Sequence, residues 1–256
     1  MDQLKLIACD PIVGLPRVPL EGIRPTVDDL LGEMHRLCLH AAIVRHRSCI
    51  DNAPYFGNRA LLEDVAGRAN LLPAWVLTPD GCEPDFDIRR TVREMLSAGV
   101  HIAWMYPKEH LYSVRPWCCG PLYAALQDAR VPLLVEFDQL SADDIHEVCL
   151  AFPHLRLVLL NVPRLGRNRL IYRLLQQHPN LCLCLGPLLS VHEGFTDLVK
   201  HFGTERWVFG TGYPVAEGGA AVTGLLYAGL PAEATQKIAH ENIERWLSEV
   251  AKDFEI

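Results

Sequence analysis

Two carboxylates and one amide stand at the ends of apolar segments in this sequence, where they could carry out acid and base chemistry. Asp10 follows LKLIAC, Glu136 follows VPLLV, and Asn161 follows LRLVLL. A buried carboxylate is costly unless it has a partner or reaches solvent. We therefore expect Asp10 and Glu136 to form a general acid and base pair, with Asn161 as the third catalytic residue. One of the two carboxylates should then have a raised pKa.

Four other side chains in loops after apolar segments are candidates for binding a substrate. They are His46, His110, Arg164 and Tyr213. Arg164 lies close enough to Asn161 in the sequence to receive an anionic group, so we expect a small substrate that bears a carboxylate. Plainer interpretations stay open: Asp10 before Pro11 is also typical of a turn, Asn161 could bind loop backbone, and loop histidines are often solvated.

Several other kinds of site are absent from the sequence. It has no Gly-x-Ser-x-Gly motif, no P-loop and no dinucleotide fingerprint. The His-Glu pairs at 146–147, 192–193 and 240–241 each lack a second histidine four residues after the first, so none of them predicts a zinc-binding helix. The glycines between Gly210 and Gly219 could still hold a phosphate or carboxylate at the start of the next helix, or simply let the loop turn.

Apolar segments alternate with segments of helical periodicity along the whole chain. The predicted strands are Leu4–Cys9, Ala41–Val44, Pro73–Leu77, Val100–Met105, Val131–Phe137, Leu155–Leu160, Leu181–Leu185 and Trp207–Gly210. The predicted helices are Thr26–Leu39, Asn58–Ala69, Phe86–Ala98, Cys118–Ala129, Ser141–Ala151, Asn168–Gln177, Val191–Phe202, Ala216–Tyr227 and Pro231–Val250. Thr26 is the expected N-cap of the first helix, and Ser141 with Asp144 resembles a capping pair.

Eight near-continuous apolar strands, each followed by a helix, predict a closed (β/α)8 TIM barrel. The competing fold is an open doubly wound sheet, but it would show a glycine-rich turn after the first strand, where only Gly14 stands. Active sites of the barrel lie at the carboxyl ends of its strands. We therefore expect Glu136 and Asn161 to end adjacent strands and to share one cleft with Asp10 and Tyr213.

Composition limits the classes of protein. Half of the residues are apolar and no linker interrupts the sequence, so residues 1–256 should form a single domain with an extra C-terminal helix. A formal charge of −7 argues against a nucleic-acid partner. The sequence shows no signal peptide and no apolar run of about 20 residues. We therefore expect a cytoplasmic location and no membrane partner. The odd number of cysteines, nine, favours reduced core thiols over disulfides.

Seven segments carry a resemblance to a known family through their order and spacing: GNRALLEDVA, AWVLTP, VPLLVEF, FPHLRLVLLN, HPNLCLCLG, ERWVFGTGYP and HENIERWL. With them the sequence resembles the amidohydrolase-related family of metal-dependent barrel hydrolases and decarboxylases. ERWVFGTGYP is the most specific segment, since it is similar to the stretch in which the last strand of that family delivers an aspartate just before Tyr-Pro. HENIERWL resembles the closing helix of the family, which contains an asparagine.

The resemblance implies a metal site, and this sequence departs from it. Family members with metal carry a His-x-His pair, two further histidines and an aspartate, and the matching positions here are Asp10, Ile12, Glu136, Asn161 and Gly212. Ile12 and Gly212 have no side-chain ligand atom. We therefore expect a degenerate metal site, with no tightly bound zinc and no other cofactor. Asp10 and Glu136 are hard oxygen donors, better suited to weak magnesium or calcium binding, and this alternative stays open.

Two functions remain open from the sequence. One is an amidohydrolase-like hydrolase that acts on a small anionic substrate at the carboxyl-terminal face of the barrel. The other is a catalytically inactive barrel that binds a ligand or another protein. The expected partner is a small-molecule ligand, and a homo-oligomer remains open.

Overall fold

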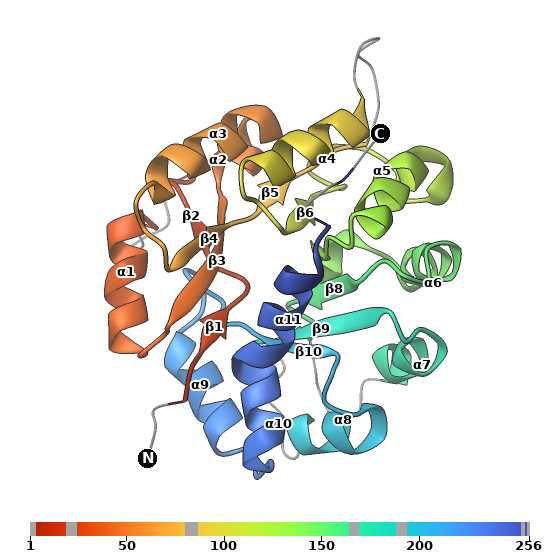
Figure 1. Ribbon diagram of the computed structural model, residues 1–256. Helices are drawn as coiled ribbons and strands as arrows, with labels where there is room; N and C mark the ends of the chain where they lie inside the picture. The colour runs from red at the N-terminus through yellow and green to blue at the C-terminus, as the bar shows by residue number, and fades with distance from the viewer. Residues whose placement is uncertain are drawn as a thin grey trace.

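Parallel strands form the centre of the computed structural model, and helices surround them (Figure 1). The structure describes residues 4–18, 25–79, 87–163, 169–187, 194–251 and 254. The strands are β1 (Ile7–Ala8), β2 (Ile12–Val13), β3 (Ala41–His46), β4 (Leu71–Pro73), β5 (Trp75–Val76), β6 (Ala103–Met105), β7 (Leu133–Glu136), β8 (Leu157–Leu160), β9 (Leu181–Leu185) and β10 (Trp207–Phe209).

The strands close into a ring. One set runs β1-β3-β2 with β4 also on β3, and the other runs β10-β9-β8-β7-β6-β5. The segment from Leu71 to Val76 is interrupted at Ala74, so that β4 pairs with β3 and β5 pairs with β6. The backbone N–H of Cys9 donates to the carbonyl of Phe209 at 2.9 Å, which joins the first strand to the last. The predicted (β/α)8 barrel is confirmed, and the open doubly wound sheet is excluded.

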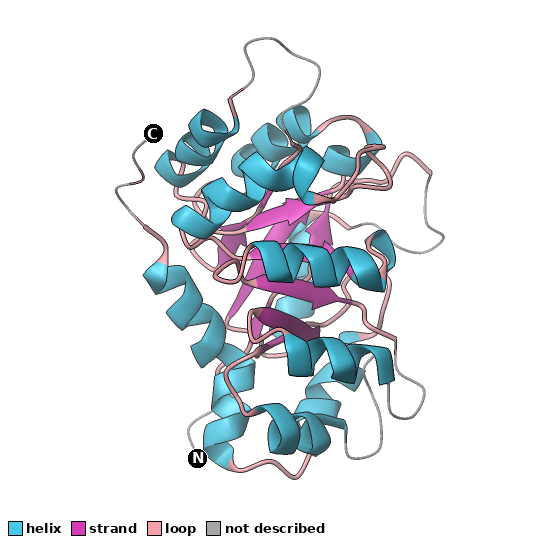
Figure 2. Ribbon diagram, turned by 90° about the vertical axis from the view of Figure 1, so that its right-hand side faces the viewer, coloured by secondary structure: helices cyan, strands magenta, loops and turns pink. Residues whose placement is uncertain are grey.

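The helices lie outside the strands (Figure 2). They are α1 (Val27–Arg36), α2 (Ser48–Asp51), α3 (Pro54–Val65), α4 (Ile88–Ser97), α5 (Pro116–Asp128), α6 (Ala142–Ala151), α7 (Arg169–Gln177), α8 (Gly194–Phe202), α9 (Gly218–Leu226), α10 (Ala232–Gln236) and α11 (Asn242–Glu249). Thr26 and Asp29 form a capping box at α1, and Ser141 and Asp144 form another at α6, because each hydroxyl accepts a helix N–H while each aspartate accepts the cap N–H. Both predicted caps are confirmed.

Some predicted boundaries were wrong. Helix α3 begins at Pro54 rather than Asn58, because proline fits the first turn of a helix, where its missing N–H has no helical acceptor. The segment predicted as one helix from Pro231 to Val250 divides into α10, a π-helical segment (Lys237–Glu241) and α11. The predicted helix starts at Phe86, Asn168 and Val191 lie outside the described residues.

The last helix closes the end of the barrel where the strands begin. Ile243 and Trp246 of α11 are each 1% exposed and pack against the side chains that fill the barrel. The side-chain amide of Asn242 donates to the carbonyls of Thr204 and Trp207 at 2.7 and 2.8 Å, which fixes α11 beside the start of β10. Helix α11 therefore covers the barrel interior at the amino ends of the strands.

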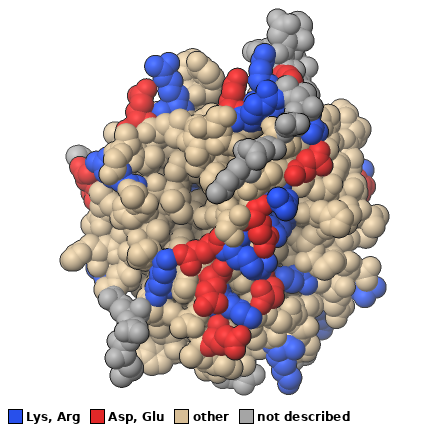
Figure 3. Space-filling model, viewed as in Figure 1, with Lys and Arg blue, Asp and Glu red and all other residues tan. Residues whose placement is uncertain are grey.

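Acidic and basic side chains are mixed on the face that carries α11 (Figure 3). Arg245 forms ion pairs with Glu205 and Glu249, and Lys237 forms one with Glu205. Charges of both signs therefore alternate among the described residues of this face. None of the helices in the described part of the chain combines the length and the apolar character that a membrane span requires.

Candidate active site

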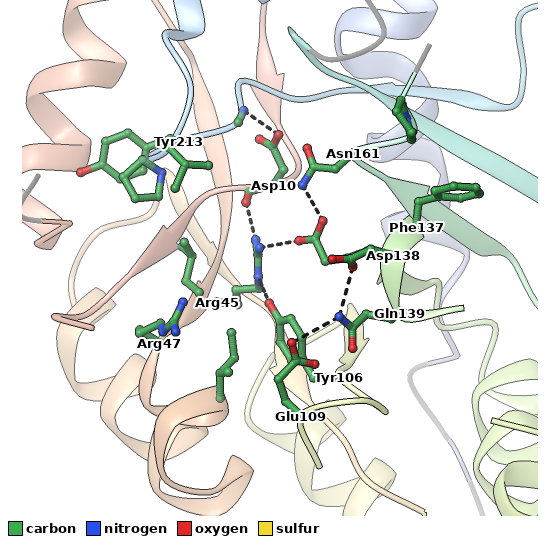
Figure 4. Close-up of a pocket in the computed structure, with 17 residues that line it drawn as sticks. Asp10, Arg45, Arg47, Tyr106, Glu109, Phe137, Asp138, Gln139, Asn161 and Tyr213 are labelled. Carbon is green, nitrogen blue, oxygen red and sulfur yellow. Dashed lines mark hydrogen bonds and ion pairs between the residues drawn. The ribbon is translucent and has the colours of Figure 1, made fainter. Parts of the chain in front are cut away.

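A pocket of about 430 Å³ opens where the strands end (Figure 4). Its lining comes from the ends of strands that lie far apart in the sequence, and includes Asp10, Arg45, Tyr106, Glu136, Asn161 and Gly212. The fold brings these residues together because all strands of a parallel barrel end on one face.

Glu136 and Asn161 are neighbours in this pocket. Glu136 is the last residue of β7 and pairs in register with Leu160 of β8, so Asn161 comes one position beyond the ladder. The side-chain amide of Asn161 donates to Oε2 of Glu136. Asn161 has a φ of +52°, a left-handed conformation that asparagine adopts more readily than most residues. The residue type thus suits the turn that places its amide beside the carboxylate.

Arg45 is the residue that reasoning from the sequence missed. Its Nη2 donates to Oε1 of Glu136 at 2.7 Å, and its Nε donates to the hydroxyl of Tyr106. Nη1 donates to the carbonyl of Asp10 and, at 3.4 Å, to that of Pro11. Only 7% of the residue is exposed. An arginine at the end of the apolar run AAIV was the available signal, since a buried cation needs an anionic partner.

Asp10 holds the loop that follows the last strand. Its Oδ1 accepts the backbone N–H of Thr211 at 2.8 Å, and its Oδ2 accepts that of Gly212 at 2.7 Å. Gly210 is required nearby, because a Cβ at this position would lie 2.5 Å from Oδ2 of Asp10. Both carboxylate oxygens are therefore occupied by backbone donors, and Asp10 is 5% exposed.

Burial changes the protonation of both carboxylates. It raises the pKa of Asp10, although the N–H groups of Thr211 and Gly212 oppose the shift. It also raises the pKa of Glu136, against the lowering effects of Arg45 and Asn161. Each carboxylate is therefore a stronger base than in water.

The four predicted substrate-binding residues have different positions. Tyr213 lines the pocket, but its hydroxyl points away from Arg45 (Figure 4), and burial raises its pKa to about 12. His46 does not line this pocket: its Nε2 lies 3.3 Å from Asp64, and burial lowers its pKa. His110 also lies outside the lining, with its Nε2 2.8 Å from the carbonyl of Cys49. Arg164 lies outside the described residues.

The donor set of the pocket does not fit a catalytic zinc site. A catalytic zinc site generally needs three protein ligands from histidine, cysteine and carboxylate, and no group of three such residues that could hold a metal occurs in the described part of the chain. Ile12 and Gly212 line the pocket without a side-chain donor. The guanidinium of Arg45 already binds Glu136, so a metal ion there would meet a fixed positive charge.

Fold and site together define a (β/α)8 barrel with a polar pocket at the carboxyl ends of its strands. The chain belongs to the amidohydrolase family, whose model matches residues 22–248. The resemblance noted in the sequence is thereby confirmed. A comparison with curated proteins gave no match.

Solved structures that share this fold include the following three. A TIM-barrel protein from Bordetella bronchiseptica is 19% identical with a TM-score of 0.70, covering 96% of this chain and 99% of that one. A proposed 2-pyrone-4,6-dicarboxylic acid hydrolase from Pseudomonas putida is 16% identical with a TM-score of 0.71, covering 96% and 98%. The 2,6-dihydroxybenzoate decarboxylase from Rhizobium is 14% identical with a TM-score of 0.72, covering 96% and 99%. At these identities the likeness establishes the barrel fold alone.

Proposed function

We propose that this protein is a hydrolase of a small anionic substrate that bears a carboxylate, with its site in the pocket at the carboxyl ends of the strands. The observation that carries the proposal is the position of Glu136, a largely buried carboxylate that Arg45 and Asn161 orient from two sides within this pocket. Such fixed orientation is what a general base requires.

In this proposal Glu136 removes a proton from a water molecule as the water oxygen attacks the carbonyl carbon of an ester, lactone or amide. The tetrahedral intermediate then collapses with cleavage of the bond to the leaving group, and Glu136 returns the proton to that group. Asn161 orients Glu136 through its amide. Asp10 is assigned to positioning, because its two oxygens hold the loop at Thr211 and Gly212.

The carboxylate on the substrate is supported by charge and by likeness. Arg45 and Arg47 line the pocket, and Arg47 is bound by Asp51 at its edge. The hydrolase from Pseudomonas putida is named for a dicarboxylic acid, and the decarboxylase from Rhizobium for a dihydroxybenzoate. Four carboxylates, those of Asp10, Glu109, Glu136 and Asp138, also line the pocket, so a substrate carboxylate would have to bind beside the guanidinium groups of Arg45 and Arg47.

The test is hydrolysis of a panel of carboxylate-bearing esters and lactones by wild-type protein and by Glu136→Gln. We expect turnover with wild type and a fall in kcat of about 10²- to 10⁴-fold in the variant, the usual size of a general-base contribution. Glu63→Gln, on the exposed surface of α3, is the matched control and should behave as wild type. Equal rates for wild type and Glu136→Gln would contradict the role of Glu136.

One observation favours the second candidate, a catalytically inactive barrel that binds a ligand. Both oxygens of Glu136 already accept hydrogen bonds, and both oxygens of Asp10 are held by backbone, so the network resembles a structural one. If no member of the panel is hydrolysed while calorimetry detects binding that Glu136→Gln weakens, this second function replaces the first.

A further inference from the structure

Among the described residues, the pocket contains one buried positive charge, the guanidinium of Arg45. The guanidinium of Arg45 contacts groups from three parts of the barrel: the backbone after β1, Tyr106 after β6, and Glu136 at the end of β7. Its Cζ also lies 3.9 Å from the centre of the Trp104 ring. The charge therefore sits where the ends of the strands converge, as Figure 4 shows for Asp10, Arg45 and Tyr106.

Most donors of this guanidinium are used to hold it in place. An arginine has five N–H donors, and the contacts with Tyr106, Glu136 and the two backbone carbonyls use four of them. Among the described residues, the second hydrogen of Nη2 has no acceptor. One donor of a rigid cation thus remains for a ligand oxygen.

A divalent ion at the position of Arg45 would need oxygens of Glu136 and Asp10, which already accept hydrogen bonds. Glu136 is bound by Arg45 and Asn161, and the carboxylate of Asp10 is bound by Thr211 and Gly212. An added metal ion would compete for these groups and repel the guanidinium. The pocket can therefore hold either the guanidinium of Arg45 or a divalent metal ion at this position, but not both.

We infer that Arg45 is the resident cation of this pocket, taking the place of a divalent metal ion and binding one oxygen of the carboxylate on the ligand. The assignment of a carboxylate to the ligand rests on the proposed function, whereas the exclusion of metal by Arg45 does not. The chemical class of ligand is a small carboxylate, since a single N–H can be offered to one of its oxygens without breaking the pair with Glu136.

The first experiment uses Mn²⁺ alone, titrated into wild-type protein, Arg45→Lys, Arg45→Ala and the double variant Arg45→Ala with Glu136→Gln, with free Mn²⁺ followed by electron paramagnetic resonance. Wild type and Arg45→Lys should bind no Mn²⁺ at this site. Arg45→Ala should bind Mn²⁺ with a Kd at least about tenfold below the highest concentration at which wild type shows no binding, and the double variant should lose that binding. Circular dichroism shows which variants are folded, and Arg45→Gln replaces Arg45→Ala if the alanine variant is not.

Two outcomes would overturn the inference about metal: Mn²⁺ bound stoichiometrically by wild type and lost in Glu136→Gln, or no gain in a folded variant without the guanidinium. The second experiment measures isophthalate binding by calorimetry. We expect binding to wild type that a chelator leaves unchanged and that weakens about tenfold or more in Arg45→Gln. No binding, or equal binding by both proteins, would overturn the assignment of the ligand. Neither experiment needs turnover, so the proposed hydrolase activity can fail separately.

Discussion

The guanidinium of Arg45 lies 3.9 Å from the centre of the Trp104 ring, and the indole Nε1 of Trp104 is buried with no hydrogen-bond partner among the described residues. Trp104 therefore supports Arg45 through the face of its ring, as in a cation–π contact. The opposite role, a hydrogen bond from the indole to the polar groups of the pocket, is not used. Arg45 is thus positioned by stacking as well as by its hydrogen bonds.

Replacing this arginine should destabilise the protein strongly. Arg45→Met leaves the buried carboxylate of Glu136 without its cation, and breaking a buried pair in this way typically costs about 3–5 kcal/mol in the free energy of unfolding. Urea unfolding at neutral pH measures it. Combining Arg45→Met with Glu136→Gln should recover part of the loss, because the unpaired charge is then absent. A double variant that is less stable than Arg45→Met would contradict this account of the pair.

The pKa of Glu136 gives a prediction for pH. Because burial raises this pKa, the folded protein keeps the proton at pH values where the unfolded chain has lost it. The free energy of unfolding should therefore fall as pH rises from about 4 through the folded pKa. Glu136→Gln should show a smaller fall in urea unfolding at a series of pH values, while Glu63→Gln should follow wild type. The pKa of Asp10 is also raised, so Asp10 adds a fall in the free energy of unfolding with rising pH in all three proteins. Identical slopes for wild type and Glu136→Gln would count against the raised pKa.

Asp10→Asn should loosen the loop after β10. An asparagine has one side-chain acceptor oxygen in place of two, so the N–H of Thr211 or of Gly212 loses its acceptor. An unsatisfied buried donor costs about 1–3 kcal/mol. Urea unfolding should show that loss, and hydrogen exchange should be faster at these two amides than in wild type. Unchanged exchange at both amides would mean that Asp10 does not hold the loop.

Purified protein should carry no tightly bound zinc, and Gly212→Asp alone should not create a zinc site. Besides the missing ligands at Ile12 and Asn161, Gly212 has a φ of +73°, and a Cβ there would lie 2.7 Å from the Cβ of Ala216, so an aspartate would be strained. Elemental analysis by mass spectrometry decides both points. Near-stoichiometric zinc that survives dialysis against a mild chelator would overturn the prediction.

The fold was predictable from the sequence because the barrel strands are apolar on both faces. Runs such as LCLCL and LRLVLL can be recognised without knowing their partners, and β9 matches its predicted range. Capping residues were equally readable, since Thr26 and Asp29 interact within one turn. Local sequence carries this information.

The site was predictable only in part, because its contacts join distant residues. A carboxylate or an amide at the end of a strand pointed to Glu136 and Asn161. The sequence could not show that Arg45 turns into the pocket while its neighbour His46 packs toward Asp64 and Gly14. Nor could it show that both carboxylate oxygens of Asp10 accept backbone N–H groups, since Thr211 and Gly212 lie 201 and 202 residues further along the chain.

That separation sets the order in which the protein can be completed during synthesis. β1 is synthesised well before the strand and loop that pair with it through Cys9 and Asp10, since the donors to Asp10 lie 201 and 202 residues further along the chain. Until then the first strand has an open edge, and closing so long a loop is entropically costly. The pocket therefore cannot exist on a nascent chain that stops before Gly212, however well its earlier strands are formed.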